Sequence, residues 1–358
     1  MRNTSHRVLF LARELSGYFL SCLEFALSEN ADLHIQIIYW PVNSEAPFEL
    51  SMEKDRLHFI PVERMNDDAF SLFISNWQPS LWIVSGWADD RYMRWVKKFK
   101  HCPKIVAFDT QWRNSLIYQI GAKWLYIKSI RFFEGAWVPG QRQAMLAQKF
   151  GFTPERIKKG YYVADENVFR NLHSIHSDRG LLKIIFVNRI VPEKGFPDAI
   201  IALGEHITQN HLSWKITVVG TGPQLVACPA LDCIDYLGFV QPQELPAILK
   251  QHHLYVLASS YEPWGVSVHE AANCGLPLIL SSAVGAADAF LEDGVNGFSF
   301  VSGDFLSMIQ AIERIHRLSQ REYNDFSHRS HELSKQINHK MWSNQLIEWL
   351  KMTEKCVG

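Results

Sequence analysis

The sequence lacks any apolar stretch long enough to cross a membrane. Its longest apolar runs, such as LLKIIFV (181–187) and HLYVLAS (253–259), are far shorter than the roughly 20 residues that a transmembrane helix needs. The first residues also lack the apolar segment of a secretory signal peptide. We therefore expect a cytoplasmic protein whose contact with a membrane, if it has one, is peripheral.

Cysteine is scarce and metal-binding patterns are absent. The 358 residues include six cysteines, and no two of them form a Cys-x-x-Cys pair. The sequence has no Asp-x-Asp motif and no other spacing typical of metal ligands. We expect reduced thiols, no metal and no other cofactor.

An excess of charge is also missing, because the formal net charge is -1, which argues against nucleic acid as a partner. The charge is nevertheless uneven: between Arg91 and Arg142 there are eleven Lys or Arg residues and two acids. Residues 96–104 and 120–133 mix these cations with aromatic residues at near-helical spacing. This pattern is typical of a helix on an anionic membrane surface, and a solvated helix face is the alternative.

What the sequence does contain is a regular alternation of short apolar runs and helix-length amphipathic segments. Such runs, rich in Val, Ile and Phe, are typical of buried parallel strands in βαβ units. They occupy residues 6–12, 33–40, 56–62, 81–86, 104–110 and 135–140 in the first half, and residues 182–188, 214–220, 234–239, 254–259, 276–282 and 297–301 in the second.

The alternation predicts two doubly wound α/β domains, with the polar segment 171–180 as a linker. We place the first domain at residues 1–165, the second at 166–335 and a C-terminal helix at 336–358, whose apolar face includes Trp342 and Trp349. In such domains ligands bind outside the carboxyl ends of the strands. The residues that follow each apolar run are therefore the candidates for function.

Cations and glycines follow the first two runs of the second half. Arg189 and Lys194 share one loop, and Gly195 follows them at what looks like a helix start, an arrangement suited to a diphosphate. Gly220 and Gly222 allow a tight turn and a close approach of backbone to a ligand. Solvated surface cations and an ordinary turn are the alternatives.

The later runs are followed by apolar residues and then by two carboxylates. Phe239 and Val240 could border a nucleobase or simply form a turn, whereas Glu262 lies in a loop and Glu270 on the next helix. Such carboxylates can accept hydrogen bonds from sugar hydroxyls, or they can be ordinary surface acids. The exposed amides near Gly265, Val266 and Ser267 would suit an anion at the helix start.

The order of these motifs is more specific than any one of them. Arg-x4-Lys-Gly, Gly-x-Gly-Pro, Gly-Phe-Val and Glu-Pro-Trp-Gly-x4-Glu follow successive apolar runs. In this order they resemble the retaining nucleotide-sugar glycosyltransferases of family 4, also called glycosyl transferases group 1. The resemblance implies a GT-B fold, in which two Rossmann-like domains face a cleft.

The resemblance also implies roles for residues of the second domain. Arg189 and Lys194 would neutralise the donor diphosphate, Glu262 would meet hydroxyls of the transferred hexose, and Glu270 would hold the nucleotide ribose. Members of the family transfer with retention and generally need no metal. The donor site would comprise Arg189, Lys194, Gly220, Gly222, Phe239, Val240, Glu262, Trp264, Gly265, Val266, Ser267 and Glu270, with UDP or GDP as the nucleotide.

The chain departs from the family pattern in three places. Asn188 stands where a glycine often precedes the loop arginine, and Asp109 aligns with a histidine that lies near the reacting sugar in many members. As the alternative, Asp109 would cap the following helix. The glycine-rich loop after the first strand is reduced to Gly17. On the acceptor side we also expect Trp87 and Trp112, which follow strands and could stack on sugar rings.

The resemblance and the basic segment together lead to a hypothesis about function. We expect a retaining hexosyltransferase that extends a saccharide or lipid-linked saccharide at the inner face of a bacterial membrane, as in capsule or O-antigen assembly. Residues 91–142 would contact the anionic lipid. A GT-B nucleotide-sugar epimerase and an inactive nucleotide-sugar-binding scaffold are the alternatives.

Overall fold

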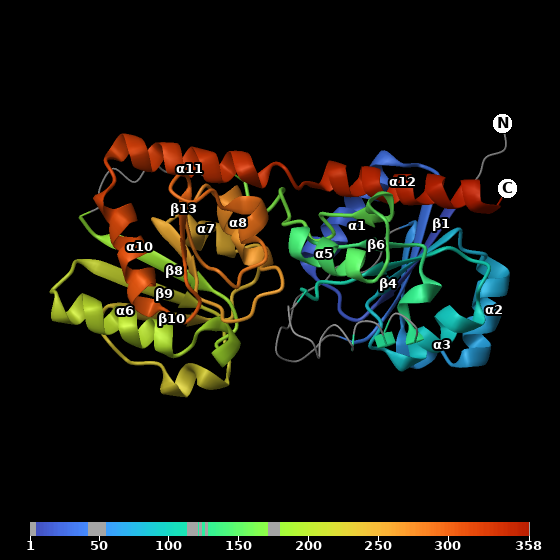
Figure 1. The fold of residues 1–358 in the computed structure, drawn as a ribbon, viewed down its shortest axis with the longest axis horizontal. Coiled ribbons are helices and arrows are strands. Elements are labelled where there is room, and N and C mark those ends of the chain that lie inside the picture. Colours follow the sequence, from blue (N-terminus) through green and yellow to red (C-terminus); the bar gives the residue numbers. More distant parts are fainter. Residues whose placement is uncertain are drawn as a thin grey trace. The chain divides into compact units, whose positions relative to one another are not determined.

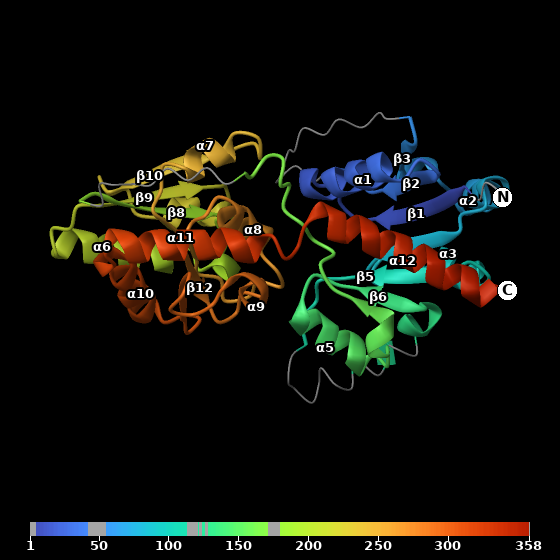
Figure 2. The same cartoon turned by 90° about the horizontal axis from the view of Figure 1, so that it is seen from above.

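The computed structural model describes residues 5–41, 55–112, 121, 124–125, 128–170 and 180–357. It divides into two compact units, the first formed by residues 1–163 with 339–358 and the second by residues 164–338 (Figures 1 and 2). The expected linker, 171–180, lies outside the described residues except for Gly180. Each unit is an α/β domain built around its own parallel sheet.

The first unit contains a seven-stranded sheet in the order β3-β2-β1-β4-β5-β6-β7. The central strands are buried and apolar, which parallel strands require because helices cover them. The strands are β1 (His6–Ala12), β2 (Leu33–Tyr39), β3 (Leu57–Pro61), β4 (Leu81–Ser85), β5 (Lys104–Ala107), β6 (Gly135–Trp137) and β7 (Ile157–Lys158). The helices are α1 (Gly17–Glu29), α2 (Asp67–Trp77), α3 (Asp90–Lys98), α5 (Gln141–Lys149) and α12 (His339–Val357).

The second unit contains a six-stranded sheet in the order β10-β9-β8-β11-β12-β13. Its strands are β8 (Leu182–Val187), β9 (Trp214–Val219), β10 (Ile234–Gly238), β11 (Leu254–Leu257), β12 (Leu278–Ser281) and β13 (Gly297–Phe300). Its helices are α6 (Asp198–Gln209), α7 (Leu245–Leu249), α8 (Val266–Asn273), α9 (Ala287–Phe290), α10 (Phe305–Arg317) and α11 (Gln320–Ser334). Figure 2 shows α11 and α10 along the sheet of this unit.

Helix α12 returns to the first unit and packs on α1. Trp342 is fully buried, and its indole N–H donates to the Tyr161 carbonyl over 3.0 Å. Trp349 lies so close to Gly135 that a Cβ there would sit 2.5 Å from the indole ring. Glycine at the start of β6 is therefore what lets the helix approach the sheet.

In both parallel sheets the strand order reverses at a central pair of strands, which is β1 and β4 in the first unit and β8 and β11 in the second. Ligands of doubly wound sheets bind at this switch point, outside the carboxyl ends of the strands. Every apolar run identified in the sequence contains a strand, and the short β7 is an addition. The predicted α/β class, with two doubly wound domains and C-terminal helices, is confirmed.

Candidate active site

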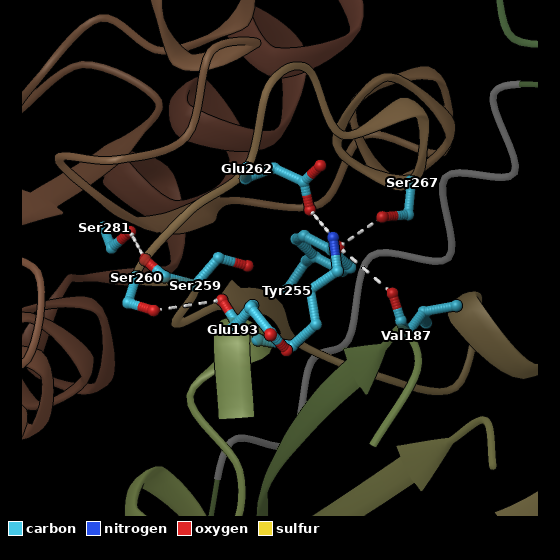
Figure 3. Close-up of polar contacts among 9 residues, drawn as sticks. Val187, Glu193, Tyr255, Ser259, Ser260, Glu262, Ser267 and Ser281 are labelled. Atoms are coloured by element: carbon cyan, nitrogen blue, oxygen red, sulfur yellow. Dashed lines mark hydrogen bonds and ion pairs between the residues drawn. The ribbon is translucent and has the colours of Figure 1, made fainter. Parts of the chain in front are cut away.

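The centre of the second unit's site is an ion pair between Lys194 and Glu262. Lys194 ends a short 3-10 helix (Pro192–Lys194) after β8, and Glu262 follows β11. Because β8 and β11 are neighbours, their carboxyl ends bring the two loops together. The two side chains are only 16% and 10% exposed, so the pair is largely withdrawn from water. Figure 3 shows the Glu262 carboxylate at this meeting point, with Tyr255 and Ser267 beside it.

Backbone hydrogen bonds hold the Glu262 loop on both sides. The Ser260 N–H donates to the Glu193 carbonyl over 2.8 Å, which ties this loop to the Lys194 loop. On the other side, the Gly285 N–H donates to the Glu262 carbonyl over 2.9 Å. The carboxylate is therefore carried by a fixed backbone, as an electrostatic site requires.

At the carboxyl edge of the second sheet, glycines allow close backbone contact between the segments that follow β8, β9 and β11. Gly195 has φ +84°, and a Cβ there would lie 2.5 Å from the Ala258 carbonyl oxygen. Gly220 has φ +134°, and its Cβ would lie 2.0 Å from the Asn188 oxygen. Among the described non-glycine residues only Gln78 and His211 have positive φ, so Asn188 adopts ordinary backbone angles.

The N-terminus of α8 lies directly after the Glu262 loop. Gly265, with φ +97°, is the N-cap residue of the helix and has no side chain with which to cap the first N–H groups. Ser267, in the first turn, shares a 2.7 Å hydrogen bond with the Tyr255 hydroxyl, whose pKa is raised by burial. The first amides of α8, including those of Val266 and Ser267, are thus the group that could receive an anion.

Glu270 lies further along α8, and its carboxyl group has a raised pKa. Burial, and secondly the charge of Asp165, raise the pKa of the Glu270 carboxyl to about 7. Trp264, between the two glutamates in sequence, is only 2% exposed, and its ring packs edge-on against Phe290 at 5.9 Å. The structure therefore groups Lys194, Glu262 and the start of α8, and places the Trp264 indole in the core.

The remaining donor-side candidates lie at the ends of β8, β9 and β10. Arg189 is exposed at the beginning of the Lys194 loop. Gly222 packs against the backbone of Ile190, where a Cβ would lie 2.3 Å from the carbonyl oxygen. Phe239 and Val240 are half-buried and directly follow β10. All of them lie at the carboxyl edge of the same sheet.

In the first unit, Asp109 is the second residue after β5, and its charge acts on the Tyr162 hydroxyl. Its backbone carbonyl accepts a 3.0 Å hydrogen bond from the Gln143 side chain. Burial, then the charge of Asp109, then groups that include Tyr18 and Glu14, raise the pKa of Tyr162 well above its usual value. The Tyr18 and Tyr162 rings meet edge-to-face at 5.7 Å. Sequence reasoning missed Tyr18 and Tyr162, although the pair Tyr161-Tyr162, which begins three residues after the end of β7, was a usable signal.

The other acceptor-side candidates serve mainly as local structure. Gly17 is the first residue of α1, and a Cβ there would meet nothing within 4 Å. Trp87 is half-buried and packs edge-on against Phe108 at 5.0 Å and Phe150 at 5.3 Å. Trp112 is half-buried, with the Lys149 ammonium 5.7 Å from its ring.

The basic segment 91–142 presents cations over aromatic rings. The Lys128 ammonium lies 4.7 Å from the ring of Trp124, which is 60% exposed. Arg131 lies 5.0 Å and Lys97 5.9 Å from the Phe132 ring. Residues 113–120, 122–123 and 126–127 of this segment lie outside the described residues.

No three His, Cys, Asp or Glu side chains in the described ranges are grouped so that they could hold a metal ion. Likewise, in the part of the chain that the structure describes, no helix is both long and apolar enough to span a bilayer.

Comparison with known proteins identifies a family model that matches the second unit and relatives that match part of the chain. Residues 170–336 match the model of a family described as glycosyl transferases group 1. Glycogen synthase of Mycobacterium tuberculosis is 31% identical over 143 residues, which is 38% of this chain and 34% of that protein. Alpha-D-kanosaminyltransferase of Streptomyces kanamyceticus is 27% identical over 139 residues, which is 37% of this chain and 36% of that protein. The match thus spans about a third of these curated relatives.

Solved structures resemble the chain over nearly its whole length. Anabaena HepE in complex with UDP and glucose has a TM-score of 0.69 at 15% identity and covers 96% of this chain and 99% of its own. Sucrose-phosphate synthase from Thermosynechococcus elongatus has a TM-score of 0.73 at 14% identity, and the match covers 98% of this chain and 100% of that protein. At these identities the likeness concerns the fold.

Proposed function

Since residues 170–336 belong to the glycosyl transferases group 1 family and the whole chain has the GT-B fold, we propose that this protein is a retaining, metal-independent glycosyltransferase. Its donor is a UDP- or GDP-linked hexose, and its acceptor is a saccharide or lipid-linked saccharide. The observation that carries the proposal is the shielded Lys194–Glu262 ion pair at the switch point of the second sheet.

The ion pair suits a site that binds a diphosphate sugar. Without a ligand, Glu262 neutralises Lys194, so neither charge is left alone in a region with little water. An entering diphosphate offers Lys194 a stronger anionic partner, and the sugar offers Glu262 hydroxyl donors. The donor would therefore exchange one set of charge-assisted bonds for another, at little cost in desolvation.

In the proposed reaction the bond between the anomeric carbon and the donor's phosphate oxygen breaks. The acceptor oxygen forms its new bond to that carbon on the same face, and its proton passes to an oxygen of the leaving diphosphate. Lys194, Arg189 and the first amides of α8 would stabilise the negative charge that develops on the leaving group. These groups would supply the electrostatic stabilisation that a metal supplies in other enzymes.

On the acceptor side we propose Asp109, together with Tyr18 and Tyr162, as hydrogen-bonding groups for sugar hydroxyls. The support is their convergence at the carboxyl edge of the first sheet, where the charge of Asp109 acts on Tyr162. Carboxylate and phenol oxygens accept and donate hydrogen bonds in the pattern that a hydroxyl-rich acceptor needs. Trp87 and Trp112 would contribute ring faces nearby.

Two measurements test the donor assignment. A thermal-shift panel of UDP, GDP, ADP and their sugar conjugates should raise the melting temperature with one nucleotide, because a ligand of the native state stabilises it. Arg189→Ala and Glu270→Ala should lose the shift, while Lys340→Ala, at an exposed lysine of α12, should keep it. No shift with any nucleotide would overturn the donor assignment. Product analysis then separates a new glycoside from an epimerised donor or binding alone.

The finer proposal is that the enzyme works on bacterial surface polysaccharide at the inner face of the membrane. The exposed Trp124 with Lys128, and Phe132 with Arg131 and Lys97, provide the aromatic and cationic groups that anionic lipid binds. The protein should sediment with anionic but not neutral liposomes at low salt. Replacing Lys97, Lys98 and Lys128 by Ala should abolish this, and the same change at the exposed Lys250, Lys340 and Lys351 should not. Equal loss in both variants would contradict a specific surface.

A further inference from the structure

Tyr255 places a hydroxyl group inside the second unit, within the apolar strand β11. The residue is 0% exposed, as are its strand neighbours Leu254 and Val256. A phenylalanine would fill the same space without bringing a polar atom into the interior, where an unpaired hydroxyl is costly. Its partners in the described part of the chain are the Ser267 Oγ at 2.7 Å and the Val187 carbonyl at 3.5 Å (Figure 3). The shorter bond connects the core to the first turn of α8.

The chemistry of the two hydroxyl groups decides which of them donates. A phenol is a better donor and a poorer acceptor than an aliphatic alcohol, because its ring draws electrons from the oxygen. The opposite arrangement would leave the Tyr255 proton to the Val187 carbonyl, at the upper limit of a hydrogen-bond distance. Tyr255 therefore donates to the Ser267 Oγ, and the Ser267 proton remains available to another acceptor.

Ser267 lies where that proton can reach a bound anion. It is the second residue of α8 and is half-buried, unlike Tyr255. Because the Cα–Cβ bonds of a helix tilt toward its N-terminus, the hydroxyl lies at the same end of α8 as the first amides. Figure 3 shows Ser267 and Tyr255 beside the Glu262 carboxylate, which is paired with Lys194. The serine hydroxyl thus adds a side-chain donor to the candidate donor site.

A buried hydroxyl without a partner also points to a ligand at this place. Ser259, shortly before Glu262, is 0% exposed, and its Oγ has no hydrogen-bond partner among the described residues. Figure 3 shows this hydroxyl on the side of Ser259 that faces Tyr255 and Glu262, whereas the Ser259 carbonyl accepts from Ser281 on the other side. Buried hydroxyls normally have a partner, so a polar group is expected to bind here.

We propose that Tyr255 is a positioning residue of the donor site, which donates to the Ser267 Oγ and so directs the Ser267 proton to an oxygen of the bound diphosphate. The inference rests on the proposed function, which supplies the diphosphate. Lys194 would meet this group as a cation, and Ser267 would add a neutral donor whose direction is set before the ligand arrives. Tyr255 acts through Ser267 and need not touch the ligand.

A double-mutant cycle tests the coupling, with UDP and GDP affinity measured by calorimetry. Ser267→Ala should weaken binding roughly tenfold or more, because a hydrogen bond to a charged group is lost. Tyr255→Phe should weaken it roughly 2- to 12-fold, and it should have no further effect in protein that already carries Ser267→Ala. Ser267→Thr, which keeps the hydroxyl, should restore the sensitivity to Tyr255→Phe. Equal losses from Tyr255→Phe with and without the Ser267 hydroxyl would overturn the proposal.

A control separates positioning from a general effect on the fold. Tyr236, in β10, donates its hydroxyl to the Pro229 carbonyl over 2.9 Å. Tyr236→Phe also removes a tyrosine hydroxyl from the second unit, and it should leave nucleotide affinity unchanged. A purely structural role of Tyr255 would lower the melting temperature of the ligand-free protein without any dependence of affinity on Ser267. That result would contradict the proposal.

Inorganic pyrophosphate, which lacks the nucleoside and the sugar, is the second probe. Its affinity should respond to Ser267→Ala and Tyr255→Phe in the same coupled way. If a nucleotide binds without this coupling, the role of Tyr255 is wrong and the proposed function stands. If pyrophosphate shows the coupling and neither nucleotide binds, the proposed function fails and the positioning of Ser267 stands. If neither pyrophosphate nor a nucleotide binds, both are wrong.

Discussion

The two units share a sheet architecture but differ in how their candidate sites are built. In the second unit, glycines with positive φ bring three backbone loops together around a fixed ion pair. In the first unit, Gly86 (φ +71°) and Gly160 (φ +81°) also follow strands, but a Cβ added at Gly86 or Gly17 would meet nothing within 4 Å, and the carboxyl edge gathers tyrosines and carboxylates. On the proposed assignment, the donor would meet a rigid backbone, whereas the acceptor would meet side chains that can change without altering the fold.

The largest expected effect concerns the stability of the first unit. Trp342→Ala should lower its free energy of unfolding by about 3–5 kcal/mol, because a fully buried indole and its hydrogen bond to Tyr161 are lost. Calorimetry should show a lowered transition, while the transition raised by a nucleotide stays in place. Trp342→Phe should lose much less. If the melting temperatures of both transitions fell by the same amount, the two units would not be separately stable.

Next comes the ion pair of the second unit. Lys194→Ala should reduce turnover about 10²- to 10³-fold, because one group that stabilises the leaving diphosphate is removed and Glu262 is left largely buried without its partner. Release of nucleotide from the donor sugar, measured with a saturating acceptor, checks this. Lys340→Ala serves as the control. Turnover within about threefold of wild type would contradict the assigned role.

A smaller effect separates the glycines of the two units. Gly220→Ala should destabilise the second unit by about 1–3 kcal/mol and weaken nucleotide binding, since its Cβ would lie 2.0 Å from the Asn188 oxygen at a φ of +134°. Gly17→Ala has open space and helical surroundings, so the first unit should keep or slightly gain stability. Denaturant unfolding of both variants measures this contrast. Equal losses of stability in the two variants would contradict the difference expected between these glycines.

The smallest effect should be found on the acceptor side. Tyr162→Phe removes a hydroxyl near Asp109 and should raise the KM for the acceptor roughly 2- to 12-fold, as expected for one hydrogen bond of about 0.5–1.5 kcal/mol. Nucleotide affinity should stay unchanged. Tyr236→Phe, in the second unit, is the matched control and should leave the acceptor KM as it is. A change in nucleotide affinity with Tyr162→Phe would contradict the proposed role of Tyr162 in acceptor binding.

Strands and motifs were predictable from the sequence where they depend on residues that are close together along the chain or on neighbouring strands. The apolar runs became strands because Val, Ile and Leu favour a buried parallel sheet, and Lys194 and Glu262 met because their strands are neighbours. The burial of Trp264 was not predictable, since nothing local shows that its ring faces Phe290. The same holds for His269, which looks like any helical residue until its contacts with Ala164 and Ser334 are seen.

The return of α12 to the first unit has a consequence for the order of events during synthesis. Residues 164–338 form the second unit and are made before α12, so this unit can fold while the first still lacks a helix. Until residues 339–357 emerge, the side of α1 that α12 covers, with Phe19 near the Trp342 position, stays open to water. The nascent chain therefore carries a folded second unit and a first unit with an exposed apolar face, which α12 covers once it has been made.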